Sequence, residues 1–163
     1  MRRIGAVGVL CLCLLFGGCR KDGALPNTTS FSCAVLFSGE EFSVAANMTR
    51  SGVGQMTLEC TAPPSLAGLK VMQNGETVTL CRDGIKTEVS PSDLPDEAMF
   101  LELCRVLDAV ALKTDLPPSD RVQGTCRGVP YTLEYDPQTG NLRVLSVPNR
   151  HFSVEFSDFL DGS

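Results

Sequence analysis

The chain has 163 residues, of which 14 are basic and 19 are acidic, and its formal net charge is −5. No run of Lys or Arg exceeds two residues, so the basic stripe that neutralises phosphates is missing and we expect no nucleic-acid partner. One histidine and the lack of a C-x-x-C motif argue against a zinc site, and we expect no metal or cofactor. The length corresponds to one domain that can bury a core without staples.

The N-terminal stretch, residues 1–18, has the parts of an export signal. Two arginines precede an apolar run from Ile4 to Phe16, and two glycines then lead into Cys19. The apolar stretch is about 15 residues long, shorter than the roughly 20 that a permanent transmembrane helix requires. We therefore expect this segment to direct export and to be removed.

The cysteine directly after two glycines makes this segment resemble a bacterial lipoprotein signal, although Phe16 stands where leucine is commonest. The resemblance implies that Cys19 is acylated with fatty acid (palmitate), becomes the new N-terminus and anchors the chain on the extracytoplasmic face of the cell membrane. A plain secreted protein and an uncleaved anchor are the alternatives. Residues 19–30, broken by Gly23 and Pro26, are predicted to form a flexible tether.

From Phe31 onward the apolar residues mostly recur with a period of two, which predicts strands with one buried and one wet face. Turn residues separate the strands; Asn74-Gly75 and Asp83-Gly84 favour positive φ and predict hairpins. A further turn is expected at Ser51-Gly52. The expected strands lie near residues 31–37, 42–48, 56–60, 69–73, 77–82, 85–89, 122–127, 131–135, 142–147 and 151–156.

One segment has helical periodicity instead. Between Leu94 and Lys113 the apolar residues fall on one stripe of an α-helix. Asp93 is expected to cap the first turn, where Pro95 is tolerated because its missing N–H would have no helical partner. The stripe comprises Phe100, Leu103, Cys104, Leu107, Val110 and Ala111.

The predicted fold is α+β: a curved antiparallel sheet or incomplete β-barrel of about nine or ten strands, with one amphipathic helix packed on it. The domain is expected to span residues 31–163. One helix of about 17 residues leaves part of such a sheet uncovered, so we expect an apolar groove beside the helix. A filled core without a groove is the alternative.

The order of elements also resembles a known group, the LolA-type lipoprotein-carrier superfamily, and especially its small clostridial lipoproteins. The resemblance lies in a lipoprotein signal, a strand meander, a helix and closing strands, with four turn and strand phrases. It implies an incomplete β-barrel closed by helices that holds acyl chains in several members, and it assigns no ligand-binding residues. The phrases are Ala62–Leu69, Gly75–Leu80, Tyr131–Asp136 and Thr139–Leu142.

Five cysteines remain in the expected mature domain after the signal and Cys19 are set aside. Five cannot all pair, and their connectivity cannot be read from spacing. Buried free thiols and one or two disulfides are both open, with free thiols favoured for Cys33, Cys60 and Cys104, which align with apolar neighbours. The other two are Cys81 and Cys126.

Catalytic residues are not predicted. His151 is the only histidine, and strand parity places it at the surface; the chain has no G-x-S-x-G elbow to present a serine. We therefore expect no enzyme, but a membrane-anchored, extracytoplasmic binding module for acyl chains or another apolar ligand.

The alternative is a membrane-tethered adaptor that binds a partner protein at the cell surface or in the spore envelope. Leu101 and Leu112 are its candidate contacts, because both are expected on the otherwise polar face of the helix.

Overall fold

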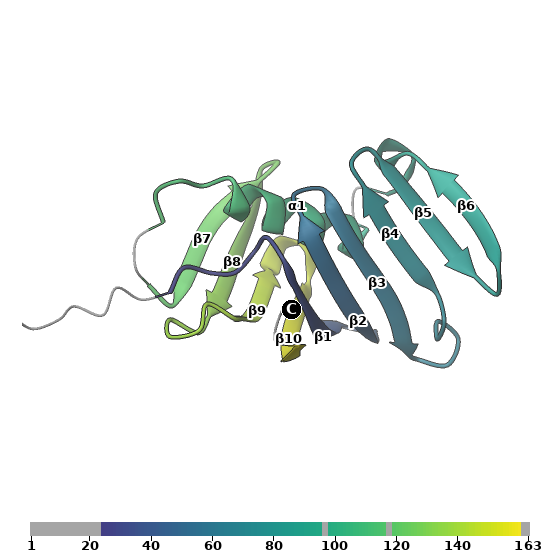
Figure 1. Ribbon diagram of the computed structural model, residues 1–163, viewed down its shortest axis with the longest axis horizontal. Helices are drawn as coiled ribbons and strands as arrows, with labels where there is room; N and C mark the ends of the chain where they lie inside the picture. Colours follow the sequence, from purple (N-terminus) through teal and green to yellow (C-terminus); the bar gives the residue numbers. More distant parts are fainter. Residues whose placement is uncertain (1–23, 96–97, 117–118, 161–163) are drawn as a thin grey trace, which may run out of the picture.

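The computed structural model describes residues 24–95, 98–116 and 119–160. Cys19 and the predicted signal lie outside this range. The predicted tether is wrong for its described part: Ala24 and Asn27 donate their N–H groups to Pro137 O and Gly140 O, each at 2.8 Å, and Thr28 is buried, so this segment packs on the domain. The described chain forms one ten-stranded antiparallel sheet with one α-helix across one face, so the predicted α+β class is confirmed (Figure 1). None of the described helices is long and apolar enough to cross a membrane.

The ten strands follow the predicted alternation closely, and three have the predicted bounds. They are β1 (Phe31–Gly39), β2 (Ser43–Gly52), β3 (Gln55–Ala62), β4 (Lys70–Asn74), β5 (Thr77–Arg82), β6 (Ile85–Val89), β7 (Arg121–Cys126), β8 (Val129–Tyr135), β9 (Leu142–Val147) and β10 (Phe152–Leu160).

The strands lie in the order β6-β5-β4-β3-β2-β1-β10-β9-β8-β7, so the first and last strands of the domain pair at its centre. Val35 of β1 lies opposite Phe156 of β10 and Ala46 of β2. Side chains alternate across a strand, so these residues share the face that packs on the helix. The outer two strands, β6 and β7, form the edges.

The helix α1 spans Met99–Ala111 and is shorter than predicted, beginning five residues after Leu94. Asp93 does not cap it. The residue belongs to a capping box with Ser90 that caps the beginning of a separate 3-10 helix, η1 (Pro91–Asp93). The backbone at Ala98 caps α1 without a side-chain hydrogen bond. A second 3-10 helix, η2 (Pro148–Arg150), joins β9 to β10.

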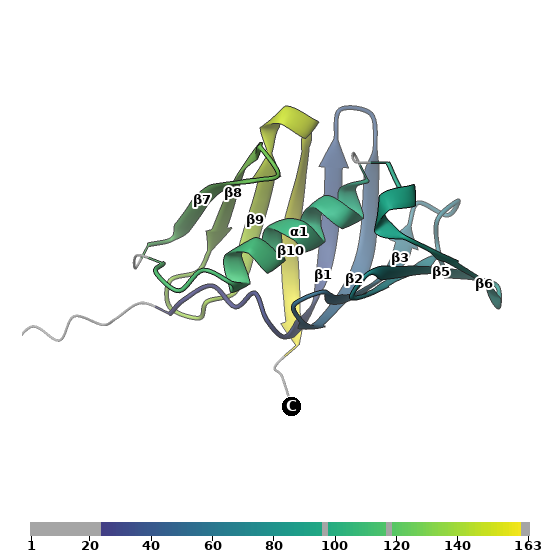
Figure 2. The ribbon, with the colours of Figure 1, turned by 90° about the horizontal axis from the view of Figure 1, so that it is seen from above.

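Figure 2 shows α1 lying across the middle of the sheet, while β4, β5 and β6 extend beyond its beginning. The core lies between α1 and the inward rows of the central strands; Val106, Leu107, Leu133 and Leu145 are all fully buried there. Strands β4 to β6 contribute one fully buried side chain, Val78. The helix therefore closes one part of the sheet and leaves another part less covered.

Two local predictions were wrong. The turn between β2 and β3 lies at Val53-Gly54, because β2 continues through Gly52 before the chain reverses. The strand predicted near 42–48 begins at Ser43, and Phe42 is exposed, with its ring packed against Gly39, where a side chain would leave no room for it.

Candidate apolar binding site

An apolar pocket of about 160 Å³ lies at the beginning of α1, between the helix and strands β1 to β4. It corresponds in position to the groove expected beside the helix. Its lining contains no charged side chain: Phe37, Val44, Ala46, Leu58, Cys60, Leu66, Val71, Met99 and Phe100.

Strand parity explains most of this lining. Phe37 of β1 lies directly opposite Val44 of β2, and both belong to rows that face the helix. Ala46 lies on the same face of β2, beside Cys60 of β3. An alanine in a row otherwise built from larger residues leaves space that α1, which begins only at Met99, does not fill.

A turn after β3 forms one wall of the pocket. Leu66 donates its N–H to Pro63 O at 2.9 Å, and Gly68 donates to Cys60 O at 2.9 Å, so the turn folds back onto the end of β3. Arg82 of β5 holds it from the other side, donating from Nη1 to Ser65 O at 2.6 Å. These hydrogen bonds fix the turn in a position where the Leu66 side chain forms one wall of the pocket.

The volume decides what the pocket can hold. Sites for drug-sized ligands measure about 300–1,000 Å³, whereas an apolar cavity of about 150 Å³ accommodates a benzene-sized group. A complete long acyl chain would not fit into about 160 Å³. The end of such a chain, or one large apolar side chain, would fit.

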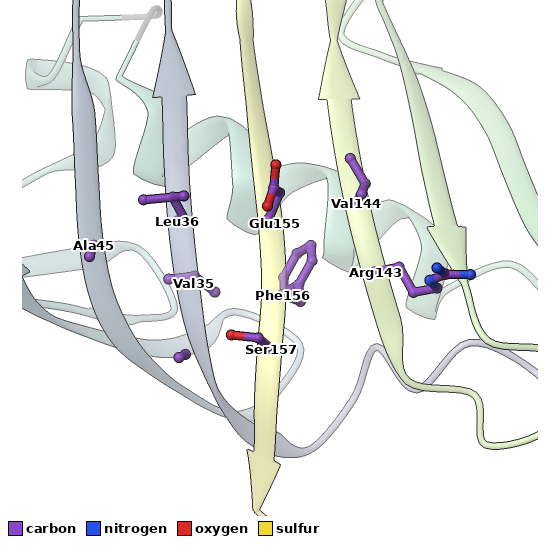
Figure 3. A pocket seen from close by; sticks show the side chains of 9 residues that line it. Val35, Leu36, Ala45, Arg143, Val144, Glu155, Phe156 and Ser157 are labelled. Carbon is purple, nitrogen blue, oxygen red and sulfur yellow. The ribbon is translucent and has the colours of Figure 1, made fainter.

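A second hollow, of about 420 Å³, lies on the opposite face of the sheet (Figure 3). Leu36, Ala45 and Val144 supply its apolar part, while Arg143 and Glu155 place opposite charges beside them. It is a mixed surface on strands β1, β2, β9 and β10. For an apolar ligand the smaller pocket beside α1 is the better match, because its lining has no charge to desolvate.

Near the other end of α1, a fully buried arginine pairs with a half-buried aspartate, a contact that the sequence did not predict. Arg50, in the inward row of β2, has a fully buried side chain, and its Nη2 lies 2.5 Å from Asp108 Oδ1. Arg50 Nε donates to Thr28 O at 2.5 Å, and Gly54 N donates to the same Asp108 oxygen at 3.0 Å. One cluster thus joins the helix, strand β2, the turn after it and the N-terminal segment. The signal was present: a charged residue at an inward position of the β2 alternation.

A polar cavity of about 230 Å³ lies beside Glu102, which is not part of the predicted apolar stripe. Glu102 is 2 % exposed, and its Oε2 lies 3.7 Å from Arg105 Nη1. Arg127 and Arg150 also line this cavity. The expectation of one wet helix face was wrong, because every residue of α1 is buried or half buried.

The two predicted partner contacts, Leu101 and Leu112, differ in exposure. Leu101 is 1 % exposed, so its predicted exposure was wrong and its side chain is not available to a partner, whereas Leu112 is 69 % exposed. His151 lies at the surface, with Nδ1 3.3 Å from Glu40 Oε1.

The five described cysteines, Cys33, Cys60, Cys81, Cys104 and Cys126, are free thiols. Burial raises the pKa of Cys33 to about 12. Burial also raises the pKa of Cys104, with Asp108 adding to the shift. Thiolate chemistry is therefore disfavoured at both positions.

No protein-family model matches this chain, and no curated protein matches it. Among solved structures, it is similar to the crystal structure of a LolA superfamily protein from Nitrosomonas europaea, with 12% sequence identity and a TM-score of 0.35 over 83% of this chain and 69% of that one.

Proposed function

We propose that this chain is a non-enzymatic, extracytoplasmic binding module, anchored to the membrane through lipid on Cys19, that holds the end of an apolar ligand such as an acyl chain. One observation carries the proposal: the uncharged pocket of about 160 Å³ between the beginning of α1 and strands β1 to β4.

The size of the pocket sets the strength of binding. Burial of a methylene contributes about 0.8 kcal/mol, so a chain end of about six carbons would gain roughly 4–5 kcal/mol. That gain corresponds to weak, reversible binding. A module that captures and releases single chain ends close to a membrane needs such reversibility.

The N-terminal sequence supports the location. The 1–18 segment resembles a lipoprotein signal, and lipid on Cys19, only a few residues before the docked segment that begins at Ala24, would keep the domain close to the bilayer. An apolar ligand that is sparingly soluble in water is concentrated at that surface.

The test fills the pocket without disturbing the core. Val71, half buried on β4, lines the pocket, so Val71→Phe adds a ring to the empty space. The matched control is Val144→Phe, also half buried in a strand, but at the hollow on the opposite face. The full-length chain in mild detergent is titrated with a fluorescent fatty acid, and folding of each variant is monitored by circular dichroism.

We expect Val71→Phe to lower fatty-acid affinity at least tenfold, as about 1.4 kcal/mol of lost burial would do, while Val144→Phe binds like the parent chain. Parent protein that binds no fatty acid would contradict the proposal. Binding that is lost in Val144→Phe and retained in Val71→Phe would move the ligand to the opposite face and would also overturn it.

The adaptor remains a second candidate, supported by the exposure of Leu112 just after α1. Crosslinking on whole cells that retrieves one dominant protein from the parent, and loses it in Leu112→Asp, would favour this candidate. Retrieval unaffected by the substitution would remove it.

A further inference from the structure

Strand β6 is an edge of the sheet, and among the described residues it pairs with β5 alone (Figure 1). Edge strands present unpaired backbone groups that can accept another strand. Ile85, at the start of β6, is 73 % exposed, which is unusual for a large apolar strand residue. Strand β6 therefore exposes both unpaired backbone groups and an apolar side chain at this edge.

The hairpin between β5 and β6 determines which backbone groups are available. Asp83 and Gly84 have φ of 52° and 81°, as in a two-residue type I′ turn, so Arg82 and Ile85 form the hydrogen-bonded pair that closes it. Such pairs alternate along an antiparallel ladder. The amide groups of Lys86 and Glu88 consequently face away from β5.

Only one antiparallel pairing of β6 with a second β6 also satisfies the charges. A two-fold axis through Thr87 places Lys86 of each copy opposite Glu88 of the other, and both are the residues whose amide groups are available. An axis through Lys86 or through Glu88 would place like charges opposite each other, which is destabilising.

The remaining contacts of this register are also complementary. Ile85 of each copy would lie opposite Val89 of the other, on the same face of the sheet as Thr87, so exposed apolar surface would be covered. A lysine on an edge commonly prevents strand pairing. Here the opposing Glu88 neutralises it.

The other edge does not share this property. In β7 the turn at Arg127-Gly128 leaves the amide groups of Arg121, Gln123 and Thr125 facing outward, by the same alternation. No two-fold axis through that strand pairs opposite charges.

We propose that the chain forms a two-fold symmetric dimer in which β6 pairs antiparallel with β6 of a second copy about an axis at Thr87. The two sheets then form one continuous sheet with four additional backbone hydrogen bonds and two cross-strand ion pairs. This proposal is independent of any ligand in the pocket.

The first test is a charge swap in the full-length chain, purified in mild detergent and measured by analytical ultracentrifugation. Lys86→Glu or Glu88→Lys alone makes both opposing pairs repulsive and should weaken dimerisation at least about tenfold. The double variant, Lys86→Glu with Glu88→Lys, restores opposite charges and should recover the parent's dimer affinity. Both positions are exposed, so folding should be unaffected.

The second test determines which residues of the two β6 strands lie opposite each other. Directly opposed residues between hydrogen-bonded pairs have Cα atoms about 4.5 Å apart, within disulfide range, so Thr87→Cys should crosslink to itself under oxidant. The matched control is Ile85→Cys, whose two copies would lie about four residues, roughly 13 Å, apart along the strands. The parent, which retains the five thiols of the described residues, sets the background.

The outcomes decide the proposal. Crosslinking at Thr87 without crosslinking at Ile85, together with rescue by the double variant, supports it. A chain that stays monomeric at its highest soluble concentration overturns it. So does a dimer unaffected by charge reversal, or crosslinking that is equal at both cysteines.

Discussion

At the scale of single residues, Arg50 is the most consequential side chain outside the pocket. Its guanidinium is fully buried and bonds to Asp108 of α1 and to the carbonyl of Thr28. A buried pair of this kind contributes little net stability compared with apolar residues, but loss of one partner leaves an uncompensated buried charge. Separating the two partners would therefore cost more than the net stability that the pair contributes.

Asp108→Ala should lower the free energy of unfolding by about 3 kcal/mol, because Arg50 stays buried without its partner. Arg50→Met combined with Asp108→Leu should recover most of the loss. Urea denaturation measures both. The control is Glu59→Ala, which breaks the exposed Lys70–Glu59 pair, 3.0 Å long, and should cost under about 1 kcal/mol. Equal losses in Asp108→Ala and Glu59→Ala would contradict this account.

A second residue-scale prediction concerns Cys33. Burial raises the pKa of this thiol from 9.0 to about 12, so the folded state holds the proton that the unfolded state releases above pH 9. The stabilisation that the buried neutral thiol gives the folded state is fully present below pH 9. It is lost as the pH rises toward 12, and the free energy of unfolding then falls by up to about 1.4 kcal/mol per pH unit.

Urea unfolding between pH 8 and pH 11 tests the sign. The free energy of unfolding should fall with pH in the parent and fall less steeply in Cys33→Ala. The matched control, Ser38→Ala, replaces a half-buried hydroxyl of the same strand that does not titrate in this range, and should keep the parent slope. Identical slopes in the parent and Cys33→Ala would show that this thiol does not contribute.

At the scale of elements, α1 has contacts on several sides and has no fully exposed face. Hydrogen bonds reach Asp108 from the β2–β3 turn, and Lys113 Nζ, just after the helix, donates to Tyr131 of β8 at 3.1 Å. The buried residues of α1 occupy most of its circumference, including Leu101 and Glu102. The predicted apolar stripe therefore accounts for only part of the helix surface that is buried.

Leu101→Asp and Leu112→Asp are a matched pair that tests this enclosure. Leu101→Asp buries an unpaired carboxylate and should cost more than about 3 kcal/mol or prevent folding. Leu112→Asp, at an exposed position, should change stability by under about 0.5 kcal/mol. Thermal denaturation compares them, and equal melting temperatures would contradict the buried placement of Leu101.

At the scale of the whole molecule, ten strands and one 13-residue helix are mismatched in extent. The helix covers the central strands, while β4 to β6 extend past its beginning (Figure 2). The apolar pocket lies at that boundary, and the β6 edge lies at the end of the uncovered part. The pocket follows from this incomplete coverage, whereas the β6 surface follows from the place of β6 at the end of the strand order.

The membrane anchor is a prediction at this scale as well. Cys19→Ser should abolish incorporation of labelled palmitate and move the chain from the detergent phase to the aqueous phase in a phase-partition assay. Cys33→Ser, at a buried thiol in β1, is the control and should retain the label. Labelling that survives Cys19→Ser would contradict the predicted lipidation site.

Much of the fold could be predicted because strand alternation and hairpin turns are local properties. The strands 77–82, 85–89 and 142–147 have the predicted bounds, and the Asp83-Gly84 turn lies where positive φ was expected. The beginning of α1 was missed because Asp93 satisfies a local capping box that competes with the helix. The burial of Leu101 was missed because periodicity describes one packing partner, whereas α1 has several.

By itself the sequence determined the strand pattern, the presence of one helix and most of the inward rows of the strands, because these depend on alternation, turn residues and the order of charged and apolar positions. Only the tertiary structure decided where α1 begins and how completely it is enclosed, that Arg50 meets Asp108 across 58 positions of the chain, and that a pocket remains beside Met99. These features depend on contacts between distant segments, whose geometry is set by how the whole sheet curves around the helix.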